Sequence, residues 1–171
     1  MTNKKLNART LKPKKDAGET IRSALALAEL VLSSEKVSTK HKKDVLHHVL
    51  WKLTEAKHPK HRLPLRTRAA HDEILKGGDL GKRLRHEHVF PRSSVVNEIM
   101  DNPKKVRRLL KKNAVACIVT KQEAESLTAQ DRRRRKAGKP KLLGWDRYKT
   151  LRLRVIEVQQ DGTLKDPAQS P

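Results

Sequence analysis

Apolar residues in the first third of the chain recur every three or four positions, which is the spacing of amphipathic helices. The first predicted helix covers residues 16–34, and its apolar face consists of Ile21, Leu25, Ala28 and Leu32. Ser38 or Thr39 can act as the N-cap of a second helix, whose apolar stripe is Val45, Leu46, Val49, Leu50 and Leu53. A third helix is predicted over residues 67–76, where Gly77 and Gly78 end it.

The second half of the chain contains both the alternating or continuous apolar patterns of strands and the spacing of helices. Residues 82–90 alternate polar with apolar side chains before Pro91, and residues 114–119 are continuously apolar, so each segment predicts a strand. Thr120 and Glu123 have the spacing of a capping box, which opens a helix that Gly138 ends. Further elements are predicted at 93–100 (helix), at Asn102-Pro103 (a capped helix start) and at 151–155 (strand).

These elements predict a helix-rich α+β fold in which N-terminal helices pack on a small ββα-like element at residues 83–130. A single domain is expected over residues 16–158. Residues 1–15 hold basic and no acidic side chains, so they are predicted to be a disordered basic arm. Residues 159–171 are predicted to be a disordered C-terminal tail.

The charge of the chain points to a polyanionic partner. Lys and Arg total 41 against 19 Asp and Glu, which gives a formal charge of +22 and a pI of about 10.5. Solubility needs a net charge of only about 2–8 in a small domain. Nucleic acid is therefore the expected partner, DNA before RNA, and a membrane is not, because no run of ~18 apolar residues occurs.

Cysteine and aromatic content narrow the possibilities further. Cys117 is the one cysteine, which excludes an intrachain disulfide framework and a cysteine zinc cluster, and a cytoplasmic location is expected. Two Trp, one Tyr and one Phe leave few rings for base stacking, so phosphate contacts should dominate. The apolar stripes of the N-terminal helices would also suit an oligomer or a larger assembly.

Runs of basic residues supply the expected nucleic-acid contacts. The main run is Arg132, Arg133, Arg134, Arg135, Lys136, Lys139 and Lys141, a predicted phosphate clamp. A second set is Lys104, Lys105, Arg107 and Arg108, and single candidates are Arg85 and Arg92. The alternative interpretation is that these are solvated helix faces and that the arginine run only complements a helix C-terminus.

The triplet His86-Glu87-His88 is the candidate for catalysis. A carboxylate next to a histidine can provide a metal ligand and a general base near neutral pH. A divalent ion bound there could stabilise the leaving oxygen of a phosphodiester. The alternative is that the three residues are ordinary polar positions of an exposed strand.

Residues 84–127 resemble the HNH-type (ββα-metal) endonucleases. The resemblance lies in Glu87-His88-Val89-Phe90-Pro91, Ala116-Cys117-Ile118-Val119 and Thr120-Lys121-Gln122-Glu123, and the segments 51–56 and 145–148 look like a wider HNH-like group. It implies Glu87 as metal ligand and catalytic residue, His88 as general base, His86 and Glu123 as further ligands, and Mg²⁺ or Mn²⁺, or else Zn²⁺, as cofactor. The sequence departs from the family because no histidine follows His88, and Glu123 is also the capping-box residue.

Two functions from different classes follow from these observations. The first is a metal-dependent HNH-like DNA endonuclease. The alternative is a nucleic-acid-binding protein without catalysis, such as a component of a ribonucleoprotein or of the nucleoid. A third possibility is a regulator that binds an acidic protein surface.

Overall fold

The computed structural model describes residues 11, 13–58 and 62–167 and has the predicted helix-rich α+β fold. Spatial contacts divide the chain into two compact units. Among the described residues, the helical unit contains 13–58 and 90–115, and the sheet unit contains 11, 62–89 and 116–167. The helical unit is thus inserted in sequence between two parts of the sheet unit.

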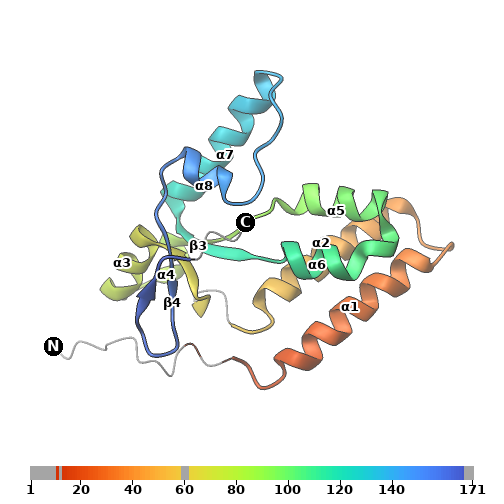
Figure 1. Cartoon of the computed structure of the whole chain (residues 1–171), viewed down its shortest axis with the longest axis horizontal. Helices are drawn as coiled ribbons and strands as arrows, with labels where there is room; N and C mark the ends of the chain where they lie inside the picture. The colour runs from red at the N-terminus through yellow and green to blue at the C-terminus, as the bar shows by residue number, and fades with distance from the viewer. Residues whose placement is uncertain (1–10, 12, 59–61, 168–171) are drawn as a thin grey trace. The chain divides into compact units, whose positions relative to one another are not determined.

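The helical unit consists of α1 (Ala17–Ser33), α2 (Thr39–Glu55), α5 (Arg92–Asp101), η3 (Pro103–Lys105) and α6 (Val106–Asn113). The apolar stripes predicted from the sequence form its core, which includes Ala28, Leu46, Leu50, Ile99 and Leu110. α1 packs along α2, and α5 and α6 complete the bundle (Figure 1).

The helices of this unit start close to the predicted positions, but one of the two predicted N-caps is not formed. Ser38 caps α2, because its hydroxyl accepts a hydrogen bond from the backbone N–H of His41. Asn102 was expected to cap the next helix, but its side-chain amide donates instead to the carbonyl of Glu98. The fixed φ of Pro103 still starts the turn there.

The sheet unit holds five strands and four helices in the described part of the chain. Its elements in order are β1 (Leu65–Thr67), α3 (Arg68–Lys76), α4 (Leu80–Arg83), β2 (Leu84–His88), β3 (Ala116–Thr120), α7 (Lys121–Lys136), α8 (Asp146–Thr150), β4 (Val155–Val158) and β5 (Leu164–Lys165). The strand order is β2-β3-β1-β4-β5, in which only the β1–β3 pair is parallel.

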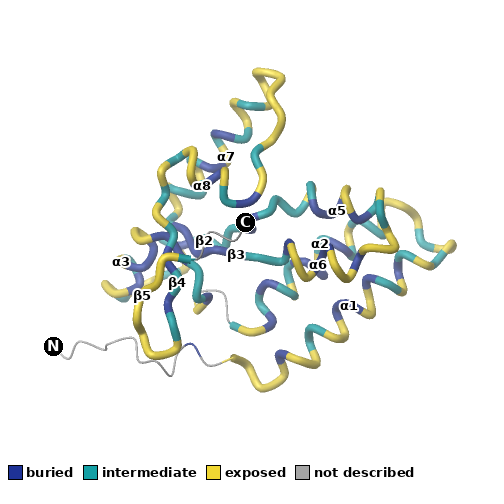
Figure 2. Tube along the Cα trace, viewed as in Figure 1, coloured by how far each residue is buried: buried dark blue, intermediate teal, exposed yellow. Residues whose placement is uncertain are grey.

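Helices cover both faces of this sheet. α3 packs on one face, where Ala70 and Ile74 meet Leu84 and Ile118. α7 contacts β2 and β3 from the other face, and the interior strand β3 is buried over residues 116–119 (Figure 2). Because successive strand residues point to opposite faces, Leu84, His86 and His88 lie on the α3 side and Arg85 and Glu87 on the α7 side.

The α3 face also buries polar groups. Arg66 is 2 % exposed and donates to the backbone carbonyl of Leu63, and burial lowers the pKa of its guanidinium to about 10. His71 of α3 is 9 % exposed, and burial, with the positive charge of Arg66 next, lowers its pKa. Burial thus lowers the pKa of both side chains on this face.

The C-terminal predictions need correction. The last strand was expected at 151–155, but the turn that follows α8, with Arg152 at positive φ, lies at the start of that segment, and β4 begins only at Val155. The expected disordered tail contains β5, which pairs with β4 through Leu164 and Val158. The rest of the tail, 168–171, and most of the predicted N-terminal arm, 1–10 and residue 12, lie outside the described residues.

The elements β2, β3 and α7 occur in the predicted order, with β2 and β3 as antiparallel neighbours. Their order does not establish a ββα-metal element, because such an element also needs side chains grouped to hold a metal ion. In the described part of the chain, no helix has both the length and the apolar character needed to span a membrane.

Candidate nucleic-acid interface

A buried arginine ties α7 to the sheet. Arg147 of α8 has a side chain only 4 % exposed, and its Nη1 donates to Glu87 Oε1 at 3.0 Å and to the carbonyl of His88 at 3.2 Å. Its Nη2 donates to Asp131 Oδ2 of α7 at 3.1 Å. Lys141 adds a second cation 3.8 Å from the same Asp131 oxygen. The network joins β2, α7 and α8 at one buried point.

Burial and this network act in opposite directions on the pKa of Glu87. Burial raises the pKa of the Glu87 carboxyl, and the nearby Arg147 guanidinium only partly offsets that rise. Without Arg147, the carboxylates of Glu87 and Asp131 would repel each other in a position that is largely shielded from solvent. Arg147 therefore stabilises the position from which the arginine run of α7 begins.

The structure does not bring the predicted metal ligands together. Glu87 lies on the α7 face, where it is bonded to Arg147, whereas His86 and His88 lie on the α3 face with ring centroids 5.1 Å apart. Within the described residues, no three His, Cys, Asp or Glu side chains are grouped to hold a metal ion. In this geometry the side chains do not fit the metal centre that the HNH resemblance implies.

Glu123, the third expected ligand, has a structural role. Its Oε2 accepts the backbone N–H of Thr120 at 2.8 Å and the hydroxyl of Thr67 at 2.7 Å. The Thr120 hydroxyl accepts the Glu123 N–H in return, so the predicted capping box is confirmed. The same carboxylate thus fixes the start of α7 and joins it to β1.

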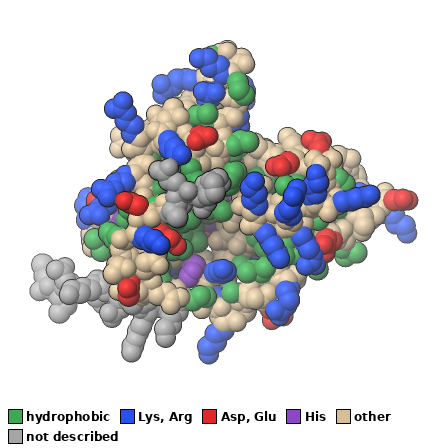
Figure 3. Space-filling model, in the orientation of Figure 1, with side chains coloured by type: hydrophobic (Ala, Val, Ile, Leu, Met, Phe, Trp, Pro, Cys, Tyr) green, Lys and Arg blue, Asp and Glu red, His purple; other side chains and the backbone are tan. Residues whose placement is uncertain are grey.

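The arginine run forms an exposed arm on this fixed base. We define the basic arm as residues 132–141, the last turn and a half of α7 and the loop that returns toward α8 (Figure 1). Its exposed cations are Arg132, Arg133, Arg135, Lys136, Lys139 and Lys141. Figure 3 shows Lys and Arg side chains gathered at this end of α7.

Internal bonds fix the shape of the arm. Arg134 is half-buried, and its Nε donates to the carbonyl of Pro140 at 2.8 Å. Gly138 adopts a φ of 65°, which favours glycine, and the next N–H, that of Lys139, donates to the carbonyl of Arg134. One arginine of the run therefore closes the loop, and the others face solvent.

The other basic residues predicted to contact nucleic acid differ in whether their side chains already have partners within the protein. Arg85 Nη1 donates to the carbonyls of Gly81 and Leu84, which holds its guanidinium beside α4. Arg92 lies over the Trp51 ring at 5.4 Å within the helical unit. Arg107 forms a two-bond ion pair with Glu29.

The other three cations of that set, Lys104, Lys105 and Arg108, are exposed on η3 and α6. They form a second basic surface, in the helical unit.

Comparisons of the chain with protein-family models, curated protein sequences and solved structures give no match. The HNH resemblance therefore has the support of the quoted residues alone.

Sequence reasoning missed the residue that organises this site. Arg147 lies in the segment 145–148, which was noted only for its resemblance to a wider HNH-like group, and no role was assigned to it. The sequence around a buried arginine does not distinguish it from an exposed one. The available signal was that Glu87 and Asp131, two acidic residues in a very basic chain, need a cationic partner if they are shielded from solvent.

Proposed function

We propose that this protein binds nucleic acid through the basic arm and does not cut it. The observation that supports the proposal is the arm itself, in which six exposed cations stand on a base fixed by the Arg147 network. Arginine and lysine side chains presented this way suit the phosphates of a polyanion. The formal charge of +22 adds long-range attraction for the same ligand.

The positions of Glu87 and Glu123 favour binding without catalysis over an endonuclease. Both carboxylates accept hydrogen bonds from groups that stabilise the fold, namely Arg147 for Glu87 and Thr120 and Thr67 for Glu123. His88 lies on the opposite face of the sheet from Glu87. A metal-dependent mechanism would need these contacts to be rearranged.

Duplex DNA is the form of nucleic acid we favour. None of the side chains of the basic arm is aromatic, so the arm has no ring on which the bases of a single strand could stack. A duplex presents its phosphates outward, where long cationic side chains reach them.

The test is a binding titration with a matched charge control. An arm variant would combine Arg132→Gln, Arg133→Gln and Arg135→Gln, and a control variant would combine Arg22→Gln, Lys36→Gln and Lys40→Gln, which are exposed in the helical unit. Both variants lose three charges. We expect the arm variant to lose at least ~10-fold in affinity for a duplex and the control far less. Equal losses would show that only net charge matters and would overturn the assignment to the arm.

A further inference from the structure

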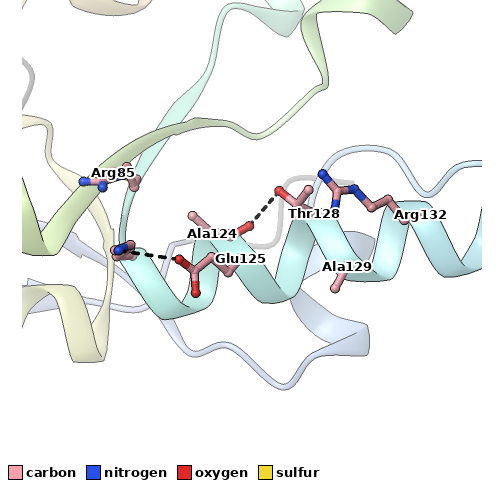
Figure 4. A pocket seen from close by; sticks show the side chains of 7 residues that line it. Arg85, Ala124, Glu125, Thr128, Ala129 and Arg132 are labelled. Atoms are coloured by element: carbon pink, nitrogen blue, oxygen red, sulfur yellow. Dashed lines mark hydrogen bonds and ion pairs between the residues drawn. The ribbon is translucent and has the colours of Figure 1, made fainter.

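An open groove runs along the exposed face of α7, with a volume of about 400 Å³. It is lined by Arg85 of β2 and by Lys121, Ala124, Glu125, Thr128, Ala129 and Arg132 of α7 (Figure 4). We call it the α7 groove. Because the α7 residues follow helical spacing, they form one continuous stripe from the start of the helix to the basic arm.

Cations stand at both ends of this stripe and small side chains lie between them. Arg85 and Lys121 lie near the N-terminal end of α7, and Arg132 lies at the other end (Figure 4). Lys121 and Arg132 are eleven positions apart, which is about 16 Å at ~1.5 Å per helical residue. Ala124 and Ala129 project little from the helix, so a bulky chain can approach it closely.

We propose that the α7 groove seats the sugar–phosphate backbone of one strand of a nucleic-acid duplex. This inference rests on the proposed function, and it makes the groove an extension of the surface that begins at the basic arm. Arg132 belongs to both surfaces, so a strand bound by the arm would continue toward Arg85 and Lys121. Successive charges of a duplex strand recur every ~3.4 Å along its axis, so a contact of this length covers several phosphates.

The lining favours a backbone over bases or an apolar peptide. It contains no aromatic ring for stacking and no large aliphatic side chain that would anchor a hydrophobic segment. Three of its seven residues are cationic and one, Glu125, is acidic. Glu125 lies 3.9 Å from Lys121, and both side chains are more than half exposed, so this ion pair is weak and can open when a phosphate arrives.

The acidic residue and the small residues make the inference testable. Ala129→Glu would place a carboxylate in the groove, and Ala129→Gln is its neutral counterpart of nearly equal size. Glu125→Gln would remove the one repulsive charge, and Glu35→Gln, exposed in the helical unit, is the matched control. Each variant would first be compared with the wild type by thermal unfolding, because binding is interpreted only for folded protein.

The experiment measures fluorescence anisotropy of a labelled duplex and of its single strand with the full chain. We expect Ala129→Glu to weaken duplex binding by about 3- to 10-fold more than Ala129→Gln does, and Glu125→Gln to strengthen it by about 3-fold, with Glu35→Gln near the wild type. We also expect the wild type to bind the duplex more tightly than the single strand.

The outcomes separate this inference from the proposed function. If the wild type binds no nucleic acid, the proposed function fails and the groove assignment with it. If the wild type binds and the arm variant is weakened, but the variants at Ala129 and Glu125 match their controls, only the groove assignment is overturned. Equal binding of single strand and duplex would overturn the duplex part of it.

Discussion

The buried guanidinium of Arg147 lies 3.1 Å from the carboxylate of Asp131, the residue directly before the arginine run of α7. The other nitrogen of the same guanidinium bonds Glu87 of β2. The ion pair thus fixes the base of the basic arm to the sheet, and the charges that follow Asp131 extend from a rigid support. This relationship links the stability of the sheet unit to the position of its main basic surface.

Replacement of Arg147 should destabilise the protein strongly. Arg147→Met removes the buried cation and leaves the partly buried carboxylates of Glu87 and Asp131 without it, so we expect a loss of about 3–5 kcal/mol in the free energy of unfolding. Urea denaturation measures this loss. A second step is a double-mutant cycle with Glu87→Gln, which should restore part of the stability. An unfolding free energy within ~1 kcal/mol of the wild type would contradict the role given to Arg147.

The capping box of α7 should contribute a smaller amount. Thr120→Ala removes the hydroxyl that accepts the Glu123 N–H, so we expect a loss of about 1 kcal/mol in unfolding free energy. Thr128→Ala is a suitable control, because Thr128 is exposed and its hydroxyl donates to the carbonyl of Ala124 in its own helix. Equal losses of unfolding free energy for the two substitutions in urea denaturation would show that the cap adds no stability beyond that of an ordinary exposed threonine.

The account predicts no metal-dependent cleavage. Glu87 and Glu123 are engaged in the fold, so the wild type should not nick a plasmid above background with Mg²⁺ or Mn²⁺. Addition of Mn²⁺ or of EDTA should also leave the thermal midpoint unchanged, because a metal bound only by the folded state would raise it. Cleavage that requires a divalent ion and disappears in His88→Ala would establish the endonuclease instead.

Stability should decrease on mild acidification, with His71 as one cause. Burial lowers the pKa of His71, with Arg66 and Arg68 acting in the same direction and Asp72 against it. The unfolded chain therefore takes up a proton first, near the ordinary histidine pKa of 6.5, and the stability contributed by neutral His71 is lost as the pH falls below that value. Burial lowers the pKa of His47 and His58 in the same way.

Urea denaturation at about pH 7.5 and about pH 5 measures this effect. His71→Gln should lose less unfolding free energy between the two pH values than the wild type, whatever its absolute stability. An identical loss in both proteins would show that His71 is not among the groups responsible.

The sequence predicted most of the secondary structure and little of the site. The stripe that includes Leu25 and Ala28 predicted α1, and the stripe that includes Leu46 and Leu50 predicted α2, because burial of one helix face imposes a regular spacing. The pairing of Thr120 with Glu123 was also visible, because both partners lie within one helical turn.

Long-range contacts were not visible in the same way. Arg147 and Glu87 are far apart in sequence, and nothing local distinguishes Arg147 from the exposed arginines. The shift of the last strand from 151–155 to β4 has a similar cause, since its register depends on pairing with β1. Local alternation at Leu151 and Leu153 predicted a strand where the chain forms the turn that follows α8.

The most direct test of the account is the salt dependence of duplex binding for the wild type, the arm variant and the control variant. If the arm contacts phosphates, the slope of log affinity against log salt should become shallower by about 2–3 when Arg132, Arg133 and Arg135 are replaced together, since each phosphate contact contributes ~0.9. The control variant with replacements at Arg22, Lys36 and Lys40 should keep the wild-type slope. Equal slopes for the wild type and the arm variant would contradict binding through the basic arm.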